Sequence, residues 1–190
     1  MPRIKPTTIY IGLAVTAVTA LILRLMGRVW WCKGGEWWPW AGDIWSSHQS
    51  QHLLDPYVFT HILHGVMFYA GLRLLGKQRF QLQVLGAVTL EAMWEILENS
   101  PIIIERYRAV TISLDYFGDS VINSVADIVA CTGGFLIAAR IPWRWSLGFF
   151  IVTELVLMAW IRDSLIINII MLTVPIDAIR EWQMGIAPAM

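Results

Sequence analysis

The stretch LLDPYVFTHILHGVMFYAGLRLL, residues 53–75, decides how the chain folds, because it combines a long apolar run with two imidazoles. Apolar segments of about 17 to 25 residues are long enough to cross a bilayer as a helix. Within the run, Tyr57, His61 and His64 follow the i, i+4, i+7 spacing that places side chains on one face of a helix. We therefore expect this polar face to point toward the interior of the bundle, where it meets polar groups on other helices.

The composition of the whole chain favours a membrane protein. Of the 190 residues, 57% are hydrophobic and 15% are charged, and the mean hydropathy is +0.59, whereas soluble domains carry about 25% charged residues. The formal net charge is zero, which gives no reason to expect a nucleic-acid partner. Cys32 and Cys131 lie in a tryptophan-rich loop and an apolar run, a pattern of neither a disulfide framework nor a metal knuckle, so we interpret them as unpaired small residues.

Further apolar runs predict an all-α integral membrane bundle that forms one transmembrane domain over residues 1–190, with about six transmembrane helices. The five long runs cover residues 7–27, 57–75, 82–98, 118–139 and 146–162. The first run continues past any possible signal-peptide cleavage site, which favours an uncleaved membrane anchor. The last run, residues 165–174, is too short to span alone. It either continues with a kink to residue 183 as a sixth span, or dips in and returns, which leaves five spans and a short segment.

Basic residues in the connections predict the orientation. One side receives seven on short connections and the other receives five on longer ones. The two sets are Arg3, Lys5, Arg73, Lys77, Arg79, Arg140 and Arg144 on the first side, and Arg28, Lys33, Arg106, Arg108 and Arg162 on the second. The positive-inside rule therefore places the N-terminus in the cytoplasm.

The loop at residues 28–56 then lies on the opposite, outer side of the membrane, and it is rich in tryptophan. Its six indoles are Trp30, Trp31, Trp37, Trp38, Trp40 and Trp45. Indole rings prefer the headgroup layer, so we expect this loop to lie at the membrane–water boundary. A tryptophan-lined cleft for carbohydrate or lipid is the alternative.

Two more predicted spans carry polar stripes at helical spacing. The stripes are Glu91, Glu95 and Glu98 in residues 82–98, and Asp119, Asn123 and Asp127 in residues 118–139. Ionisable groups inside a bilayer cost about 2.5 to 3.5 kcal/mol each and normally face a bundle interior. Because successive spans alternate in direction, these stripes and the two histidines are expected in the same half of the membrane, whichever side is outside.

Imidazoles opposite carboxylates predict a metal site. The candidate ligands are His61, His64, Glu91, Glu95, Asp119 and Asp127. Such a set suits a divalent zinc, iron or manganese ion, although the chain has no HExxH or EF-hand motif. A purely structural alternative stays open, in which the histidines hydrogen-bond Glu95 or Asp119 and Asn123 bonds across helices. In this alternative the three glutamates, Glu98 above all, pair with Arg106, Arg108 or Arg162.

The segment before residue 57 adds a second polar group. His48, His52 and Asp55 follow a spacing of four and then three, as on a short helix that ends at Pro56. We expect these three residues to cover the entrance to the site and to take part in catalysis, with Arg162 receiving an anionic headgroup.

Four segments carry a family resemblance: SSHQSQHLLDPYVFTHILHG (46–65), EAMWEILENSP (91–101), GDSVINSVAD (118–127) and IRDSLIINIIML (161–172). They resemble a family of small bacterial inner-membrane proteins, a domain of unknown function. This resemblance implies a multi-pass membrane protein and supplies no activity. The segment DIVACTGGFLI (127–137) is also similar to the aspartate-and-glycine helix of VanZ-like proteins, with Cys131 where that helix usually shows Asn. The GxSG, paired-EE and PSGH motifs of other intramembrane enzymes are absent.

Together these patterns predict a membrane-embedded enzyme, a hydrolase or transferase, that acts on a lipid or lipid-linked substrate at the periplasmic leaflet. The chemistry is either metal-dependent or carried by a buried carboxylate acting as general acid or base. Two other classes stay open: a transporter or proton-relay component, and a non-catalytic membrane assembly factor. The expected partner is the lipid bilayer, and the oligomeric state is left open.

Overall fold

A computed structural model describes residues 3–76, 79–113 and 115–185. In this part of the chain the fold is all-α, as predicted, with eight helices and no strand. The helices are α1 (Pro6–Leu25), α2 (Val58–Leu74), α3 (Phe80–Glu98), α4 (Pro101–Val110), α5 (Val121–Ala138), α6 (Trp143–Ile161), α7 (Leu165–Thr173) and α8 (Asp177–Met184). Lys77, one of the basic residues that indicate the orientation, lies outside the described residues.

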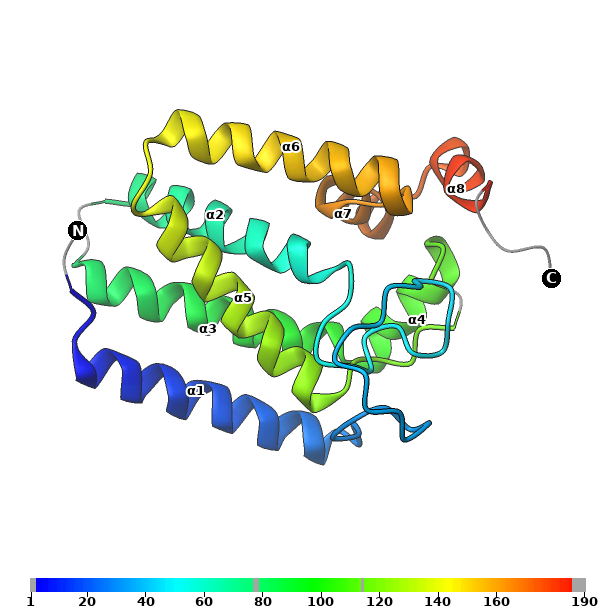
Figure 1. Ribbon diagram of the computed structural model, residues 1–190, viewed down its shortest axis with the longest axis horizontal. Helices are drawn as coiled ribbons and strands as arrows, with labels where there is room; N and C mark the ends of the chain where they lie inside the picture. The colour runs from blue at the N-terminus through cyan, green and yellow to red at the C-terminus, as the bar shows by residue number, and fades with distance from the viewer. Residues whose placement is uncertain (1–2, 77–78, 114, 186–190) are drawn as a thin grey trace.

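Five long helices lie side by side and alternate in direction (Figure 1). Helices α1, α3 and α6 run one way, and α2 and α5 run the other. The short α5–α6 connection lies at the end where α1 begins, while the α1–α2 loop, α4, α7 and α8 gather at the opposite end. This arrangement places the start of α2, the end of α3 and the start of α5 together, as the polar stripes predicted.

The outer helices expose apolar side chains, which is the reverse of a water-soluble bundle. In α1 only Thr8, Thr19 and Leu23 are buried. The large apolar side chains exposed on α1 and α6 include Ile9, Ile11, Leu13, Leu21, Leu147, Ile151, Val152, Leu155 and Val156. Among the described residues, three helices (α1, α5 and α6) are long and apolar enough to cross a membrane.

Three candidate spans are fewer than the six predicted. Helix α2 has 17 residues, which is the lower limit of spanning length, and α3 carries three glutamates that lower its hydropathy. The last apolar stretch forms α7, a helix of only nine residues, and its continuation is the separate helix α8. Both stay at the end of the bundle where α6 finishes (Figure 1), because Arg162 adopts a left-handed conformation with φ 51° that ends α6. The described chain therefore has no sixth long helix.

Helices α2 and α5 cross at two glycines, and this crossing positions the site. A Cβ atom on Gly65 would overlap the backbone carbonyl of Cys131, and one on Gly134 would overlap the carbonyl of Ile62. Only a residue without a side chain lets two helix backbones approach so closely. Because His61 and His64 lie within one turn of Gly65, the close approach carries them toward the polar face of α5.

Candidate functional site

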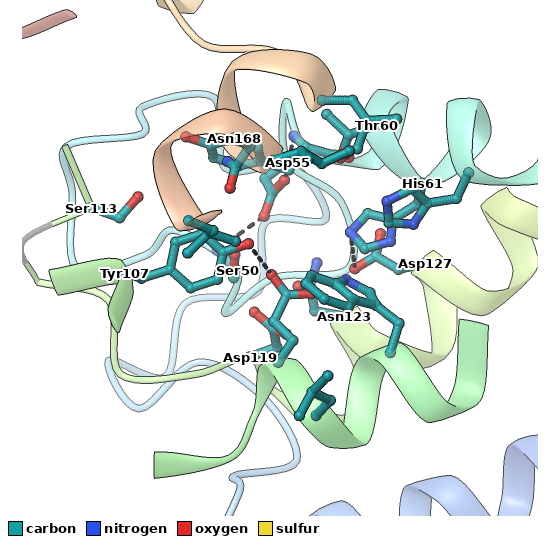
Figure 2. A pocket seen from close by; sticks show the side chains of 18 of the residues that line it. Ser50, Asp55, Thr60, His61, Tyr107, Ser113, Asp119, Asn123, Asp127 and Asn168 are labelled. Atoms are coloured by element: carbon teal, nitrogen blue, oxygen red, sulfur yellow. Dashed lines mark hydrogen bonds and ion pairs between the residues drawn. The ribbon is translucent and has the colours of Figure 1, made fainter. Parts of the chain in front are cut away.

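His61 lies at the centre of the polar cluster. Its side chain projects from α2, and its Nδ1 atom lies 2.6 Å from Glu91 Oε1 and 3.4 Å from Glu95 Oε1, both on α3. On the other side of the ring, Nε2 lies 3.9 Å from Asp127 Oδ2 on α5, and Figure 2 shows these two side chains facing one another. One imidazole thus links three helices and faces three carboxylates.

His64 extends the cluster by one helical turn. Its Nδ1 lies 3.0 and 3.1 Å from the two oxygens of Glu91, so this carboxylate accepts from both histidines. The Glu91 side chain is fully buried, whereas His64 keeps a small exposed edge. A buried carboxylate requires such partners, since an unpaired charge away from water is costly. The predicted histidine partners were Glu95 or Asp119, but the main partner in the structure is Glu91.

Several buried oxygens in the cluster lack a hydrogen-bond partner within the described residues. They include both carboxylate oxygens of Glu95 and the Oδ1 atom of Asp127. Two donor sets, His61–His64–Glu91 and His61–Glu95–Glu98, each offer three ligand atoms within 4.8 Å of one another. Neutral imidazole and carboxylate oxygen are common ligands of zinc, iron and manganese. The donor chemistry therefore fits a divalent metal, and a bound cation would satisfy the unpartnered oxygens.

Asp119 belongs to a neighbouring network and makes no ion pair with the histidines. Its carboxylate accepts hydrogen bonds from Asn99 Nδ2 at 2.8 Å and from the Tyr116 hydroxyl at 2.9 Å. Its backbone N–H donates to Asn99 Oδ1 at 2.7 Å. Asp119 therefore orders the α3–α5 junction beside the cluster.

A cavity of about 550 Å³ opens beside these groups. Its polar side includes Asp55, His61, His64, Asp119, Asn123 and Asp127. Its apolar side includes Met67, Phe68, Leu90, Met93, Trp94, Leu97, Leu165, Ile169 and Leu172. Among the labelled side chains of Figure 2, His61 and Asp127 lie at one side of this space and Asn168 at the other. The cavity thus joins a polar floor to an apolar wall.

Among the four predicted catalytic residues, Asp55 lines this cavity. Its carboxylate accepts hydrogen bonds from the backbone N–H groups of Ser50 at 3.0 Å and Tyr57 at 2.7 Å, and burial raises its pKa above the ordinary value. The segment at residues 46–57 forms turns and not the predicted short helix.

The other three candidates lie elsewhere. His48 and His52 gather with Cys32 and Glu36 in the α1–α2 loop. Arg162 donates from Nη1 to the Trp182 carbonyl at 2.7 Å, which ties the end of α6 to α8. None of the three is among the residues that line the cavity of about 550 Å³.

Three buried polar groups were not singled out in the sequence. Asn99 bridges α3 to Asp119, as described above. Glu154 on α6 accepts the backbone N–H groups of Leu165 and Ile166 at 3.0 and 3.1 Å, so it caps α7. Asp163 accepts from the Tyr57 hydroxyl at 3.1 Å, and burial raises its pKa to about 7. The available signal was an acid inside or beside an apolar run, as Glu154 is within residues 146–162.

Comparison with known proteins identifies the family. The family model described as "Protein of unknown function (DUF2585)" matches residues 23–185. The chain belongs to this family. A UPF0314 protein of Rhizobium meliloti (strain 1021) is 45% identical over 175 residues, covering 92% of this chain and 89% of the relative. A UPF0314 protein of Paracoccus denitrificans (strain Pd 1222) is 46% identical over 170 residues, covering 89% of this chain and 88% of the relative.

A third relative, a UPF0314 protein of Brucella anthropi, is 44% identical over 177 residues, with 93% of this chain and 90% of the relative covered. No solved structure matches the chain. The resemblance to an uncharacterised bacterial family that the sequence motifs indicated is therefore confirmed.

Proposed function

We propose that this protein is a membrane-embedded enzyme, a hydrolase or transferase, that acts on a lipid or lipid-linked substrate. The five long helices cross the bacterial inner membrane together, with α2 and α3 held inside by their polar contacts. The N-terminus lies in the cytoplasm, so the cavity lies in the periplasmic half of the membrane. The α1–α2 loop with its tryptophans rests at the periplasmic boundary.

One observation carries this proposal: the apolar wall of the cavity continues to the outer surface of the bundle. Met67, Leu90, Met93, Leu97 and Ile169 line the cavity, yet these residues are between 40% and 62% exposed. In a bilayer this exposed apolar surface faces lipid. A substrate with an acyl or polyprenyl chain would therefore enter sideways from the membrane, keep its chain on this wall and bring its polar group to the histidines.

The polar floor supplies the chemistry in either of two ways. In the metal version, His61, His64 and Glu91 would hold the ion, Glu95 and Asp127 would lie beside it, and a bound divalent cation would supply a water nucleophile at neutral pH. In the metal-free version, the His61 ring sits between Glu91 and Asp127 and moves a proton as general base and then general acid. In both versions Asp55 and Asp119 shape the entrance and contact the polar part of the substrate.

The transporter alternative is less well supported. A relay across the membrane needs polar groups along its whole depth. On the cytoplasmic side of the cluster, however, Val84, Ala87 and Phe135 form an apolar core packed by Phe68 and Tyr69. Among the residues that the structure describes, a chain of proton carriers therefore does not continue through this core. The assembly-factor alternative explains the ion pairs but not the apolar-walled cavity beside them.

The test combines metal analysis with lipid mass spectrometry. Full-length protein in detergent or nanodiscs is analysed for metal and incubated with vesicles of total inner-membrane lipid. We expect the wild type to convert a lipid species, and His61→Ala and Glu91→Gln to lose that conversion while keeping the folded state. Loss of bound metal in the same variants supports the metal version, and full metal-free activity supports the general-base version. Glu105→Ala, an exposed acid on α4, is the control and should behave as wild type.

One combination of results would refute the proposed function. If no lipid is converted, and His64→Gln lowers thermal stability yet complements a deletion strain fully, the cluster only holds the helices together and the proposal fails.

A further inference from the structure

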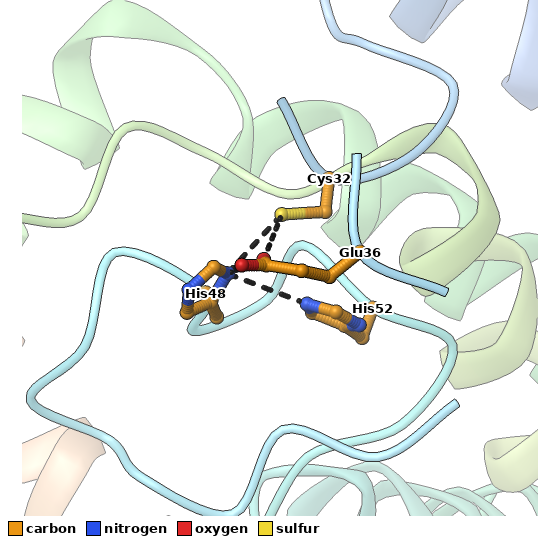
Figure 3. Close-up of side chains that lie close together, drawn as sticks. All are labelled: Cys32, Glu36, His48 and His52. Atoms are coloured by element: carbon orange, nitrogen blue, oxygen red, sulfur yellow. Dashed lines mark hydrogen bonds and ion pairs between the residues drawn. The ribbon is translucent and has the colours of Figure 1, made fainter. Parts of the chain in front are cut away.

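A second group of metal-ligating side chains lies in the α1–α2 loop, outside the cavity. Cys32 and Glu36 come from one stretch of the loop, and His48 and His52 come from another (Figure 3). The Cys32 Sγ atom lies 3.2 Å from His48 Nδ1 and 3.9 Å from Glu36 Oε2. His48 Nδ1 lies 3.0 Å from Glu36 Oε2 and 3.5 Å from His52 Nε2. Four side chains of three ligand types thus point at one small volume.

These separations, which run from 3.0 to 3.9 Å, bracket the edge lengths of a tetrahedral zinc site. With Zn–N near 2.1 Å and Zn–S near 2.3 Å, tetrahedral ligands lie about 3.3 to 3.8 Å apart. All four donor atoms lie within 4.8 Å of one another, and the four separations above scatter around the tetrahedral value. Small movements of the Glu36 and His48 side chains would bring the donor atoms to the separations of a tetrahedral zinc site.

The surroundings fix one ligand in the required form. The His52 ring is buried, with 2% exposure for the residue, and its Nδ1 is hydrogen-bonded to the backbone carbonyl of Trp38. An Nδ1–H that donates to a carbonyl leaves the Nε2 lone pair free, which is the tautomer and orientation found in metal-ligating histidines. The Trp31 ring makes a T-shaped contact with the same imidazole. His52 therefore presents Nε2 to the cluster without further rearrangement.

The solvent access and the net charge of these four side chains are also compatible with a bound metal ion. Cys32 is buried, while the side chains of His48 and Glu36 are 35% and 44% exposed, which leaves an entry path from solvent. A Cβ on Gly34 would lie 2.9 Å from the Glu36 carboxylate and 3.4 Å from His48 Cε1, so a glycine leaves these ligands their space. One thiolate, one carboxylate and two neutral imidazoles around Zn²⁺ give zero net charge, which suits a partly buried site.

We propose that Cys32, Glu36, His48 and His52 form a structural zinc site that ties the two halves of the α1–α2 loop together. A closed set of four protein ligands is typical of structural rather than catalytic zinc. The site does not depend on the proposed enzymatic function. It bears on the cavity, however, because the two histidines bracket Gln49 and Ser50, which line it.

Ser50 shows how the loop is connected to the cavity. Its N–H donates to Asp55 at 3.0 Å, and its carbonyl accepts from Ser120 N–H at 2.8 Å, just before α5. Zinc bound at His48 and His52 would hold Ser50 from both sides, and so would hold the cavity wall. In this proposal Cys32 is therefore a zinc ligand and Cys131 is not, although the sequence alone suggested that both were unpaired small residues.

The deciding experiment is cobalt substitution of the full-length protein in detergent. Metal is removed with a chelator under reducing conditions, and Co²⁺ is titrated in. We expect a thiolate-to-cobalt charge-transfer band in the near ultraviolet that saturates at one equivalent and is displaced by Zn²⁺. Cys32→Ser should abolish the band, and Cys131→Ser, the matched control at the other cysteine, should keep it. Failure of the wild-type protein to give any charge-transfer band overturns the proposal without reliance on a variant.

Measuring the zinc bound by variants distinguishes this site from the cavity cluster. A protein carrying His61→Ala and His64→Ala should still retain one zinc per chain, and adding Cys32→Ser or His52→Ala to it should remove that zinc. Retention of zinc after Cys32→Ser in the same background also overturns the proposal. If only the variants at His61 lose metal, that result bears on the proposed function and not on the zinc site in the loop.

Discussion

The crossing of α2 and α5 offers the sharpest test of how the fold builds the site. Replacing Gly134 by alanine adds a single methyl group, which would overlap the Ile62 carbonyl and lie 3.1 Å from the Ile62 Cα atom. Both contacts are with backbone, so no side chain can move aside. The two helices must part by about 1.5 Å to restore ordinary van der Waals separation.

Gly133 is a matched control one residue away on the same helix. A Cβ there meets nothing within 4 Å. Glycine in a helix interior costs about 1 kcal/mol relative to alanine, so Gly133→Ala should stabilise the protein by up to that amount. Gly134→Ala gains the same helix propensity but suffers overpacking of about 1 to 3 kcal/mol or more. The variants should therefore differ by roughly 1 to 3 kcal/mol.

The assay is thermal unfolding in one detergent, followed by circular dichroism. A domain of this size shifts its Tm by about 2 to 4 °C per kcal/mol, so Gly134→Ala should melt roughly 2 to 12 °C below Gly133→Ala. The His61–Asp127 separation, now 3.9 Å, should also widen and impair the proposed activity. Equal Tm values for the two variants, or a higher Tm for Gly134→Ala, would refute the close helix approach.

Two further predictions concern the α6–α7 corner. Glu154→Ala leaves the N–H groups of Leu165 and Ile166 without their buried acceptor, so we expect a loss of about 2 to 4 kcal/mol in thermal unfolding; an unchanged Tm contradicts this capping role. Asp163 has its pKa raised by burial from 3.8 to about 7. The unfolded chain then loses this proton at lower pH than the folded chain, so stability should fall by up to about 4 kcal/mol between pH 4 and 7. Asp163→Asn should flatten this part of the Tm-against-pH curve, and an identical pH profile for wild type and variant would contradict the prediction.

The sequence by itself determined the all-α fold, the long helices and the end of the bundle where polar groups gather. Apolar runs of spanning length are local features, and i, i+4, i+7 spacing assigns residues such as His61 and His64 to one helix face without tertiary information. Alternation of direction then places the stripes of neighbouring helices at the same depth. The sequence overestimated the number of spans, because the length of an apolar run does not show that Arg162 ends α6 and that α7 remains at the same end.

Tertiary structure alone decided which groups meet. The partner of both histidines is Glu91 rather than Asp119, because the Gly65–Gly134 crossing sets the rotation of α2 against its neighbours, and spacing within one helix carries no information about that rotation. Asp119 is instead bound by Asn99, and Glu154 caps a helix that begins eleven residues later. Likewise, Cys32 and His48 are 16 residues apart in an irregular loop, where no periodicity exists from which their contact could be predicted. Loop geometry and helix rotation depend on long-range packing, and these two factors determine the chemistry of the site.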